Sequence, residues 1–156
     1  MTTASTVQRY LDGHGIAYDM LSHRPTMSSL DTAQAAHVSG NKLAKAVVLK
    51  TNAGYLVAVV PASHHLQWPA LHGCLGQVLA LATEEEITWL FPDCTLGAVP
   101  PFGDAYGIET VVDDSIAEQS DIYFEGGDHG TLLHVAGPAF RTLMAQAKHG
   151  RFSSHH

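Results

Sequence analysis

The sequence predicts an α+β (mixed α/β) fold, in which a single domain is built on a mixed β-sheet flanked by helices. Residues 45–50 and 55–60 form two apolar runs rich in β-branched side chains, separated by four residues, which is typical of a β-hairpin. Segments with helical periodicity alternate with further strand candidates along the chain. The chain has 156 residues, 46% of them hydrophobic and 15% charged, which suffices to bury one globular core.

The N-terminal residues predict a helix, a strand and a second helix. Apolar residues recur at helical spacing from Val7, and the glycine-containing segment 13–15 ends that helix. Residues 16–23 are expected to form a short strand. The side chain of Ser28 can cap a second helix that extends to Val38.

The middle of the chain contains the hairpin and two further helices. The hairpin runs are continuous rather than alternating, so both faces of these strands are expected to be covered, as at the centre of a mixed sheet. Residues 64–75 predict a helix interrupted by Pro69, and residues 77–80 predict a short strand. Thr83 and Glu86 have the spacing of a capping box, which predicts the start of the next helix.

The C-terminal third predicts strands followed by one helix. Residues 97–107 are rich in glycine and proline and predict a loop. The final helix is expected to begin at Gly137-Pro138, because proline suits the first turn of a helix. Residues 149–156 have no pattern, so we expect a domain of residues 1–148 followed by a frayed tail. The strand candidates between the loop and the final helix are residues 109–112, 121–124 and 131–135.

The formal net charge of −7 is unevenly distributed. Residues 1–83 carry five bases and three acids, residues 84–128 carry twelve acids and no base, and residues 129–156 carry three bases and no acid. An acidic total argues against sequence-independent binding along nucleic acid, which needs many phosphate contacts. It allows a small basic site that holds one end of an anionic substrate. We interpret the acidic block as a solvated face.

Composition also predicts the compartment. No stretch reaches the ~20 apolar residues of a membrane span, and the first residues lack the pattern of a signal sequence. The two cysteines, Cys74 and Cys94, provide no disulfide framework. We therefore expect a cytoplasmic protein without a membrane partner.

Common catalytic and cofactor motifs are missing from the sequence. It lacks the usual nucleotide-binding glycine patterns and the G-x-S-x-G of serine hydrolases. Among the eleven histidines, the densest group is His64-His65 with His72 and Cys74. A helix would place His65 and His72 on one face and turn His64 away, so we favour surface histidines over zinc ligands. We expect no metal and no cofactor.

Two features near the predicted sheet suit an anionic or carbonyl-containing ligand. Lys45, at the head of an apolar strand, is either a harmless residue with its ammonium in water or a fixed cation for a phosphate or carboxylate. Spacing alone favours the first interpretation. In Gly97-Ala-Val-Pro-Pro-Phe-Gly103 the prolines restrict the backbone and the glycines permit close approach of a ligand. This loop either binds a carbonyl oxygen through backbone N–H groups or is a stiff surface turn.

A third feature is the glycine-rich segment 126–130 between two strand candidates. Its glycines are expected to leave Asp128 and His129 exposed at a loop tip. A histidine there could act as a base, an acid or a hydrogen-bond donor. A plain hairpin turn explains the segment equally well.

Taken in order, these features resemble the YbaK family, which includes the editing domain inserted in bacterial prolyl-tRNA synthetases and its free-standing relatives. The resemblance covers residues 5–147, and the lysine together with the G-x-x-x-P loop is its most specific part. The motifs that carry it are Leu43-Ala-Lys45-Ala-Val-Val-Leu-Lys50, Val60-Pro61-Ala62, Gly97-Ala-Val-Pro-Pro101-Phe-Gly103, Asp113-Asp-Ser115 and the strands within residues 124–135.

The resemblance implies hydrolysis of the ester bond in a mischarged aminoacyl-tRNA. It places Lys45 near the phosphate of the terminal adenosine, and Gly97 to Pro101 near the aminoacyl carbonyl. Catalysis in the family depends on a substrate hydroxyl and a positioned water rather than on a protein nucleophile, which agrees with the missing triad. We expect Lys45, Gly97 and Pro101 to serve catalysis. Further substrate contacts are expected from Tyr18, Phe102, Gly103 and His129.

The expected substrate carries a small amino acid such as alanine, cysteine or serine, on tRNA-Pro or a similar tRNA, because such editors exclude larger side chains sterically. Ala46 departs from relatives that carry a polar asparagine or threonine after the lysine. The alternative is a non-catalytic module of the same fold that docks to a synthetase or holds a nucleotide-like ligand. A histidine-based metal binder is a third interpretation. The expected partners are the acceptor end of aminoacyl-tRNA and a synthetase, and the expected state is a monomer or weak homodimer.

Overall fold

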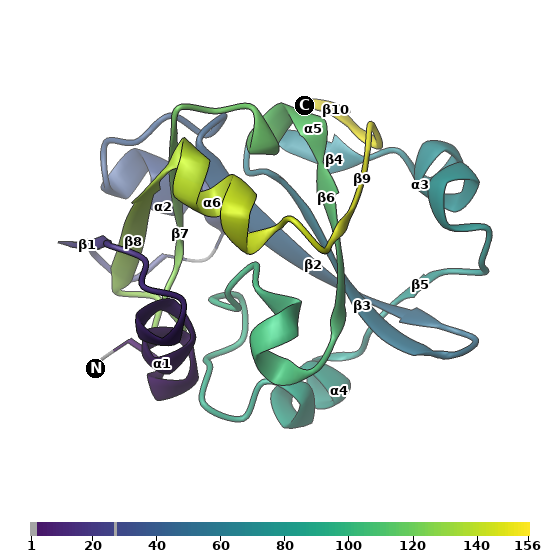
Figure 1. Cartoon of the computed structure of the whole chain (residues 1–156), viewed down its shortest axis with the longest axis horizontal. Coiled ribbons are helices and arrows are strands. Elements are labelled where there is room, and N and C mark those ends of the chain that lie inside the picture. The colour runs from purple at the N-terminus through teal and green to yellow at the C-terminus, as the bar shows by residue number, and fades with distance from the viewer. Residues whose placement is uncertain (1–2, 27) are drawn as a thin grey trace.

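The structure is a computed structural model, and it describes residues 3–26 and 28–156. Within these residues a mixed sheet forms the centre of the molecule and helices pack on both of its faces, which confirms the predicted fold class (Figure 1). The helices are α1 (Ser5–Gly13), α2 (Ser29–Ala35), α3 (Trp68–Leu75), α4 (Glu84–Leu90), the 3-10 helix η1 (Gly103–Tyr106), α5 (Asp114–Ala117) and α6 (Gly137–Leu143). The strands of the sheet are β1 (Asp19–Ser22), β2 (Leu43–Thr51), β3 (Gly54–Pro61), β5 (Ala80–Leu81), β6 (Glu109–Asp113), β7 (Asp121–Glu125), β8 (Thr131–Ala136) and β9 (Lys148–Gly150). Outside this sheet, β4 (His64–Leu66) pairs with β10 (Ser153–His155).

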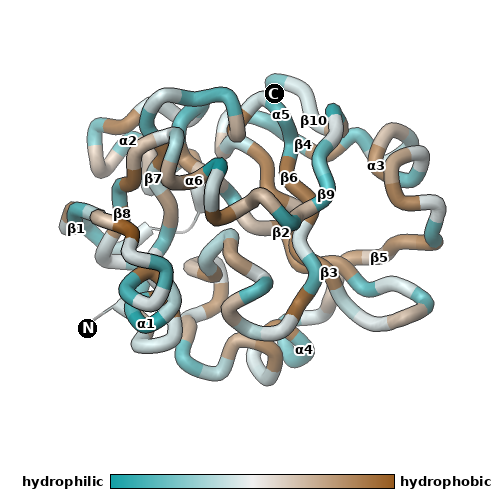
Figure 2. The backbone as a smooth tube through the Cα atoms, viewed as in Figure 1, coloured by the Kyte–Doolittle hydropathy of each residue, from teal (hydrophilic) through white to brown (hydrophobic). Residues whose placement is uncertain are grey.

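The predicted hairpin lies at the centre of the sheet. The strand order is β1-β8-β7-β2-β3-β6-β9, and β5 pairs with the end of β2. β2 and β3 are antiparallel, from Ala44 opposite Pro61 to Thr51 opposite Gly54. On their outer sides β2 runs parallel to β7, and β3 runs parallel to β6. The hydrophobic residues of these central strands are visible in Figure 2, and their continuous runs agree with burial on both faces.

The two faces of the sheet carry different cores. Successive side chains of β2 alternate between the faces. Ala44 and Ala46 belong to the main core, which α1, η1, α5 and α6 cover. On the opposite face, Leu43 belongs to a small core under α2 and Val47 to a core under α3. Lys45 is two residues from both Leu43 and Val47, so its side chain points to the same face of the sheet as theirs. This is the face that carries α2 and α3.

Three helices begin where local signals in the sequence place them. The Ser28 side chain accepts a hydrogen bond from the Asp31 N–H at 3.1 Å and caps α2. Thr83 and Glu86 make both hydrogen bonds of the predicted capping box at the start of α4. Pro138 lies in the first turn of α6, where its missing N–H leaves no bond unmade. These starts depend on neighbouring residues alone, which explains why the sequence predicts them.

The prediction of one helix over residues 64–75 is wrong. Residues 64–66 form β4, and α3 begins only at Trp68, with Pro69 in its first turn. β4 is a strand because its partner is β10, and His64 contacts Ser153 from 89 residues away. No local pattern predicts a pairing over such a distance.

The C-terminal residues are ordered rather than frayed, contrary to the expectation from sequence. β9 pairs in parallel with β6, and Phe152 is fully buried in the core under α3. The Phe152 N–H donates to Oδ1 of the buried Asp113 at 2.7 Å. Smaller differences are a shorter first strand (β1), a later strand β5, the helix η1 within the predicted loop, and the helix α5 that the sequence analysis missed.

The acidic block of residues 84–128 is not one solvated face. Asp113, Glu125 and Asp128 are only 2, 6 and 5% exposed. Within α4, Glu86 accepts a hydrogen bond from the Tyr55 hydroxyl and pairs with Lys50 at 3.0 Å. The acidic side chains of this block therefore include several that hold the fold together.

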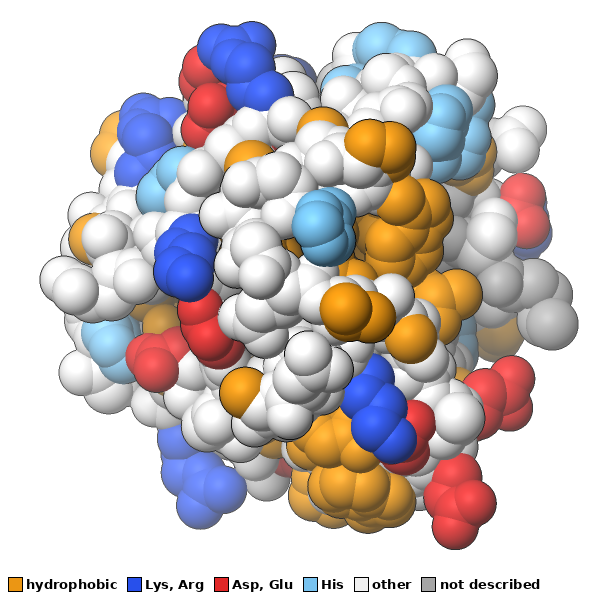
Figure 3. Space-filling view, turned by 90° about the vertical axis from the view of Figure 1, so that its right-hand side faces the viewer, with side chains coloured by type: hydrophobic (Ala, Val, Ile, Leu, Met, Phe, Trp, Pro, Cys, Tyr) orange, Lys and Arg blue, Asp and Glu red, His pale blue; other side chains and the backbone are white. Residues whose placement is uncertain are grey.

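Exposed hydrophobic side chains gather on the face shared by α3, β5 and α4 (Figure 3). They include Trp68, Leu81 and Trp89, which are 40, 62 and 57% exposed. None of the predicted site residues belongs to this group. Among the described helices, none combines the length and the apolar character needed to cross a membrane.

Candidate active site

Lys45 lies on β2 between the cores under α2 and α3. Its Nζ donates a hydrogen bond to the carbonyl oxygen of His64 in β4, at 2.9 Å. Burial lowers the pKa of this half-buried ammonium from its usual value. An ammonium has three N–H bonds, so two remain for an anion. Attraction to such an anion is stronger here than in bulk water, because the effective dielectric constant is lower.

The turn between β7 and β8 emerges beside Lys45. β7 runs parallel to β2, with Phe124 opposite Ala44. Glu125 and Lys45 are the next residues along these two strands, and the turn of residues 126–130 follows immediately. Paired residues of parallel strands point to the same face of a sheet. The sheet therefore brings Lys45 to the base of this turn.

His129, in this turn, is in direct contact with Gly97. The φ angles of the two residues are +59° and +84°, and the His129 Nε2 donates a hydrogen bond to the carbonyl oxygen of Leu96. A Cβ atom at position 97 would lie 2.9 Å from Cε1 of the His129 ring, closer than real Cβ contacts. Glycine at this position is required by the left-handed backbone and by the ring packed against it.

The hydrogen bond to Leu96 fixes the tautomer of the neutral His129 ring. A carbonyl oxygen only accepts, so Nε2 carries the hydrogen and Nδ1 carries a lone pair. This Nδ1 atom is buried and has no hydrogen-bond partner among the residues that the structure describes. The ring thus carries one hydrogen-bond acceptor that the described residues leave unused.

The loop that begins at Gly97 contains backbone N–H groups without an acceptor among the described residues. Its two prolines have no N–H, and the Ala98 N–H donates to the carbonyl of Thr95 at 3.0 Å. Within the described part of the chain, the N–H groups of Gly97 and Val99 have no acceptor. The Thr95 N–H also donates to Gly127 at 2.7 Å, which ties the loop to the turn of His129. Fixed donors of this kind stabilise an oxygen that gains negative charge.

The remaining predicted site residues make packing contacts. Phe102 is 2% exposed, and its ring stacks on Tyr10 with a centroid distance of 5.4 Å. Pro101 and Gly103 are buried, and a Cβ at Gly103 would lie 2.7 Å from a backbone oxygen. Tyr18 packs against the main core. The packing of Phe102 and Gly103 holds the loop in place, and contact of any of these residues with a substrate stays a prediction.

The expectation that Asp128 is exposed at a loop tip is wrong. Asp128 is 5% exposed, and its carboxylate accepts hydrogen bonds from the Gly130 N–H at 3.0 Å and the Thr131 hydroxyl at 3.1 Å. These bonds close the turn and fix the backbone next to His129. Half-burial of His129 follows from its contact with Gly97.

A buried pair, His23 and Glu125, lies beneath the turn and was missed by the sequence analysis. The His23 N–H donates to the carbonyl of Gly130 at 2.9 Å, and its Nδ1 bonds to the carbonyl of Arg24 at 2.8 Å. Its Nε2 lies 3.6 Å from Oε1 of Glu125, and the two side chains are 0 and 7% exposed. Burial raises the pKa of Glu125 to about 7, and His23 opposes this increase. The sequence offers one signal for this pair. Glu125 is an acidic residue at the end of an apolar strand, immediately before two glycines.

Replacement of Glu125 by Gln is expected to change the pH dependence of stability. The pKa of Glu125 is raised from 4.5 to about 7 on folding, so the folded state holds a proton that the unfolded state has released between these pH values. The free energy of unfolding of the wild type therefore falls as pH rises through this window, by up to about 3 kcal/mol. Glu125→Gln does not titrate, so its stability relative to wild type should increase from pH 4.5 to pH 8. Urea denaturation of both proteins at several pH values measures this difference, and a constant difference would refute the assignment.

The histidine group considered as a metal site is dispersed. The Nδ1 of His64 contacts the Ser153 hydroxyl at 2.9 Å, and the His65 ring lies within hydrogen-bond reach of Gln67 at 3.1 Å. Over residues 3–26 and 28–156, no three histidine, cysteine or acidic side chains are close enough together to hold a metal ion.

Comparison with known proteins was made on sequence and on structure. Residues 23–143 match the model of the aminoacyl-tRNA editing domain family. Among curated protein sequences, none matches the chain. A structure described as a proposed trans-editing enzyme for prolyl-tRNA synthetase superimposes with a TM-score of 0.85 at 20% identity, covering 99% of this chain and 98% of that one. The hypothetical protein APE2540 gives a TM-score of 0.84 at 23% identity, covering 96% and 100% of the two chains.

A proposed signal-transduction protein from Marinobacter aquaeolei VT8 is also similar, with a TM-score of 0.78 at 23% identity. The match covers 95% of this chain and 30% of that longer one. At these identities the structural matches establish the fold, and the sequence match spans most of the chain. The chain therefore belongs to the aminoacyl-tRNA editing domain family and has the fold and the editing role of that family.

Proposed function

We propose that the chain is a trans-acting deacylase, which hydrolyses the ester of a tRNA mischarged with a small amino acid such as alanine, cysteine or serine. The observation that supports it most is the contact of Gly97 with the His129 ring, in the turn that follows the strand next to Lys45. In this proposal Lys45 provides a cation and the Gly97 loop provides backbone donors, which together orient an ester for attack by water. The similarity to a proposed trans-editing enzyme for prolyl-tRNA synthetase makes tRNA-Pro the first tRNA to test.

In this mechanism Lys45 holds the substrate. Its two unused N–H bonds bind the phosphate of the terminal adenosine, which fixes the acceptor end against the sheet. The N–H groups of Gly97 and Val99 donate to the ester carbonyl oxygen. The carbonyl carbon then lies beside the turn that carries His129.

A water molecule attacks the carbonyl carbon, and the carbonyl oxygen becomes the oxyanion of a tetrahedral intermediate. The donors at Gly97 and Val99 stabilise this charge more strongly than they stabilise the neutral carbonyl. The intermediate collapses with cleavage of the bond between the carbonyl carbon and the ribose oxygen. The proton lost by the water ends on that ribose oxygen, directly or through the substrate's neighbouring hydroxyl, so that free amino acid and intact tRNA are released.

A deacylation panel tests this proposal. Wild-type protein is incubated with Ala-, Cys-, Ser- and Pro-tRNA-Pro, and the remaining aminoacyl-tRNA is measured over time. We expect at least one of the small-residue substrates to be hydrolysed and Pro-tRNA-Pro to be spared. Binding of these tRNAs without hydrolysis would support the alternative, a non-catalytic module of the same fold, and would refute the deacylase.

Chelation should leave the rate of deacylation unchanged. The mechanism uses water, backbone N–H groups and Lys45, and the candidate ligands around His64 are dispersed. Deacylation is measured before and after dialysis against EDTA. A loss of activity that added zinc restores would contradict this prediction.

A further inference from the structure

A cavity of about 410 Å³ lies on the sheet face opposite Lys45. Its walls come from α1, η1, β6, the end of α6 and the segment that leads into β9. This face carries the main core, whereas Lys45 belongs to the face with α2 and α3. A cavity of this size is in the range that small ligands occupy. The cavity therefore lies away from Lys45, and it shares with the proposed active site only Phe102 of the Gly97–Gly103 loop.

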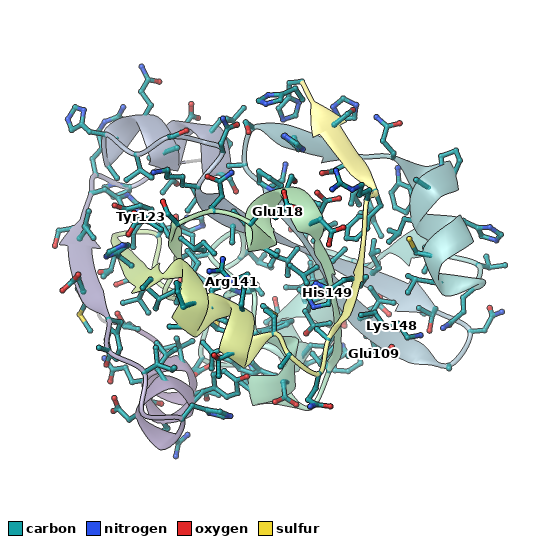
Figure 4. All side chains as sticks on the ribbon, turned by 45° about the horizontal axis from the view of Figure 1, so that its top comes forward. Glu109, Glu118, Tyr123, Arg141, Lys148 and His149 are labelled. Carbon is teal, nitrogen blue, oxygen red and sulfur yellow. The ribbon has the colours of Figure 1, made fainter. Side chains whose placement is uncertain are left out.

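The charges at the mouth of the cavity favour a cation. Among the described residues that line the cavity, Asp104 and Glu109 are exposed carboxylates, Lys148 is the one strong base and His14 is the one imidazole. Lys148 pairs with Glu109, with 3.6 Å between Nζ and Oε1, and Figure 4 shows the two side chains together on neighbouring strands. Asp104 lies beside the Tyr10 hydroxyl, and burial together with this carboxylate raises the pKa of Tyr10 to about 12. One negative charge thus stays uncompensated at the mouth.

The floor of the cavity is aromatic and contains one unused polar atom. The Tyr10 ring stacks on Phe102, and aromatic faces attract cations through their negative π surface. Thr110 lines the cavity and is 7% exposed. Its hydroxyl oxygen has no hydrogen-bond partner among the described residues. An unsatisfied buried hydroxyl costs stability, and a ligand with an N–H donor would satisfy it.

We propose that this cavity binds a small organic cation, namely a primary ammonium attached to a short apolar or aromatic body. The body packs on Tyr10 and Phe102, and the ammonium donates to Asp104 and to the Thr110 hydroxyl. This proposal uses neither Lys45 nor the His129 turn, because Tyr10, Phe102 and Thr110 lie on the opposite face of the sheet from Lys45.

Titration with three matched compounds tests the site. We use 2-phenylethylamine, the neutral 2-phenylethanol and the anionic 3-phenylpropionate, each followed by ¹⁵N-resolved NMR. The amine should bind saturably and shift the resonances of Tyr10, Thr110 and Leu143. The alcohol should bind roughly 10-fold more weakly, and the acid should not bind. Equal binding of amine and alcohol, or saturable shifts that map elsewhere, would overturn the proposal, as would the absence of saturable binding by the amine.

Variants separate the cavity from the overall acidic charge of the protein. Replacing both Asp104 and Glu109 by their amides should weaken amine binding about 10-fold. The matched control, Asp12→Asn with Glu85→Gln, removes two exposed carboxylates outside the cavity and should leave binding unchanged. Ala145→Phe fills the cavity from its exposed rim and should abolish binding, with an unchanged circular dichroism spectrum. Full binding by this variant, or equal loss in the control, would refute the site.

Discussion

Gly97→Val is expected to lower kcat for deacylation by roughly 100-fold or more, which is the effect of losing one oxyanion donor. Valine resists the φ angle of +84°, and its Cβ would lie 2.9 Å from the His129 ring. The loop must shift to relieve this contact, and the N–H groups of Gly97 and Val99 shift with it. The effect should appear in kcat rather than KM, because the carbonyl oxygen gains most of its charge in the transition state. Steady-state kinetics on the substrate found in the panel measures both constants.

Gly107→Val is the matched control for this variant. Gly107 also has a positive φ angle, of +72°, but its Cβ would meet nothing within 4 Å. The two variants therefore share backbone strain, and only Gly97→Val disturbs His129. A normal kcat with a raised KM in Gly97→Val would mean that the loop only shapes the entrance. Equal losses of kcat in both variants would mean that Gly97→Val acts by general destabilisation of the protein.

Lys45→Ala is expected to lower kcat/KM by roughly 10- to 150-fold, as for the loss of a charged hydrogen bond worth about 1.5–3 kcal/mol. The ammonium is half buried and has two N–H bonds free for a phosphate. Its removal also leaves the His64 carbonyl without this donor, which should cost only about 1 kcal/mol of stability. Deacylation assays and a thermal melt, made on the same preparation, separate the two effects.

Two further lysine variants make this test specific. Lys50→Ala removes a lysine from the same strand, where the side chain is exposed and pairs with Glu86, and it should retain full activity. Lys45→Met keeps most of the apolar stem and should lose as much activity as Lys45→Ala. Unchanged turnover in both Lys45 variants would remove the lysine from the mechanism. A large fall in melting temperature would make it structural.

Local features of the fold could be predicted from the sequence because their causes lie within a few residues. The capping box of Thr83 and Glu86 and the hairpin around residues 51–54 are of this kind. The strand β4 and the ordered C-terminus could not, because His64 pairs with β10 and Phe152 is held by Asp113. Such contacts join segments that are far apart in the sequence, so no local pattern predicts them.

The candidate site divides in the same way. Gly97 was predicted to permit the close approach of a ligand, and the structure gives a different reason for a glycine here, which is the His129 ring packed against it. The pair of His23 and Glu125 could not be predicted, since more than a hundred residues separate its members and neither has a motif of its own. Burial of Asp128 could not be predicted for a different reason. The neighbouring glycines predict an exposed side chain, but the carboxylate is buried because it accepts hydrogen bonds from Gly130 and Thr131.

The pairing of β4 with β10 has a consequence for synthesis of the protein in the cell. His64 and Ser153 are 89 residues apart, so at the usual elongation rates the partner of β4 is made about 4–18 s after β4 itself. During that interval the apolar residues that Phe152 later covers remain open on the nascent chain. The core under α3 is therefore completed late in translation. Until then its apolar residues are exposed, and this is the period in which chaperone binding would most reduce aggregation.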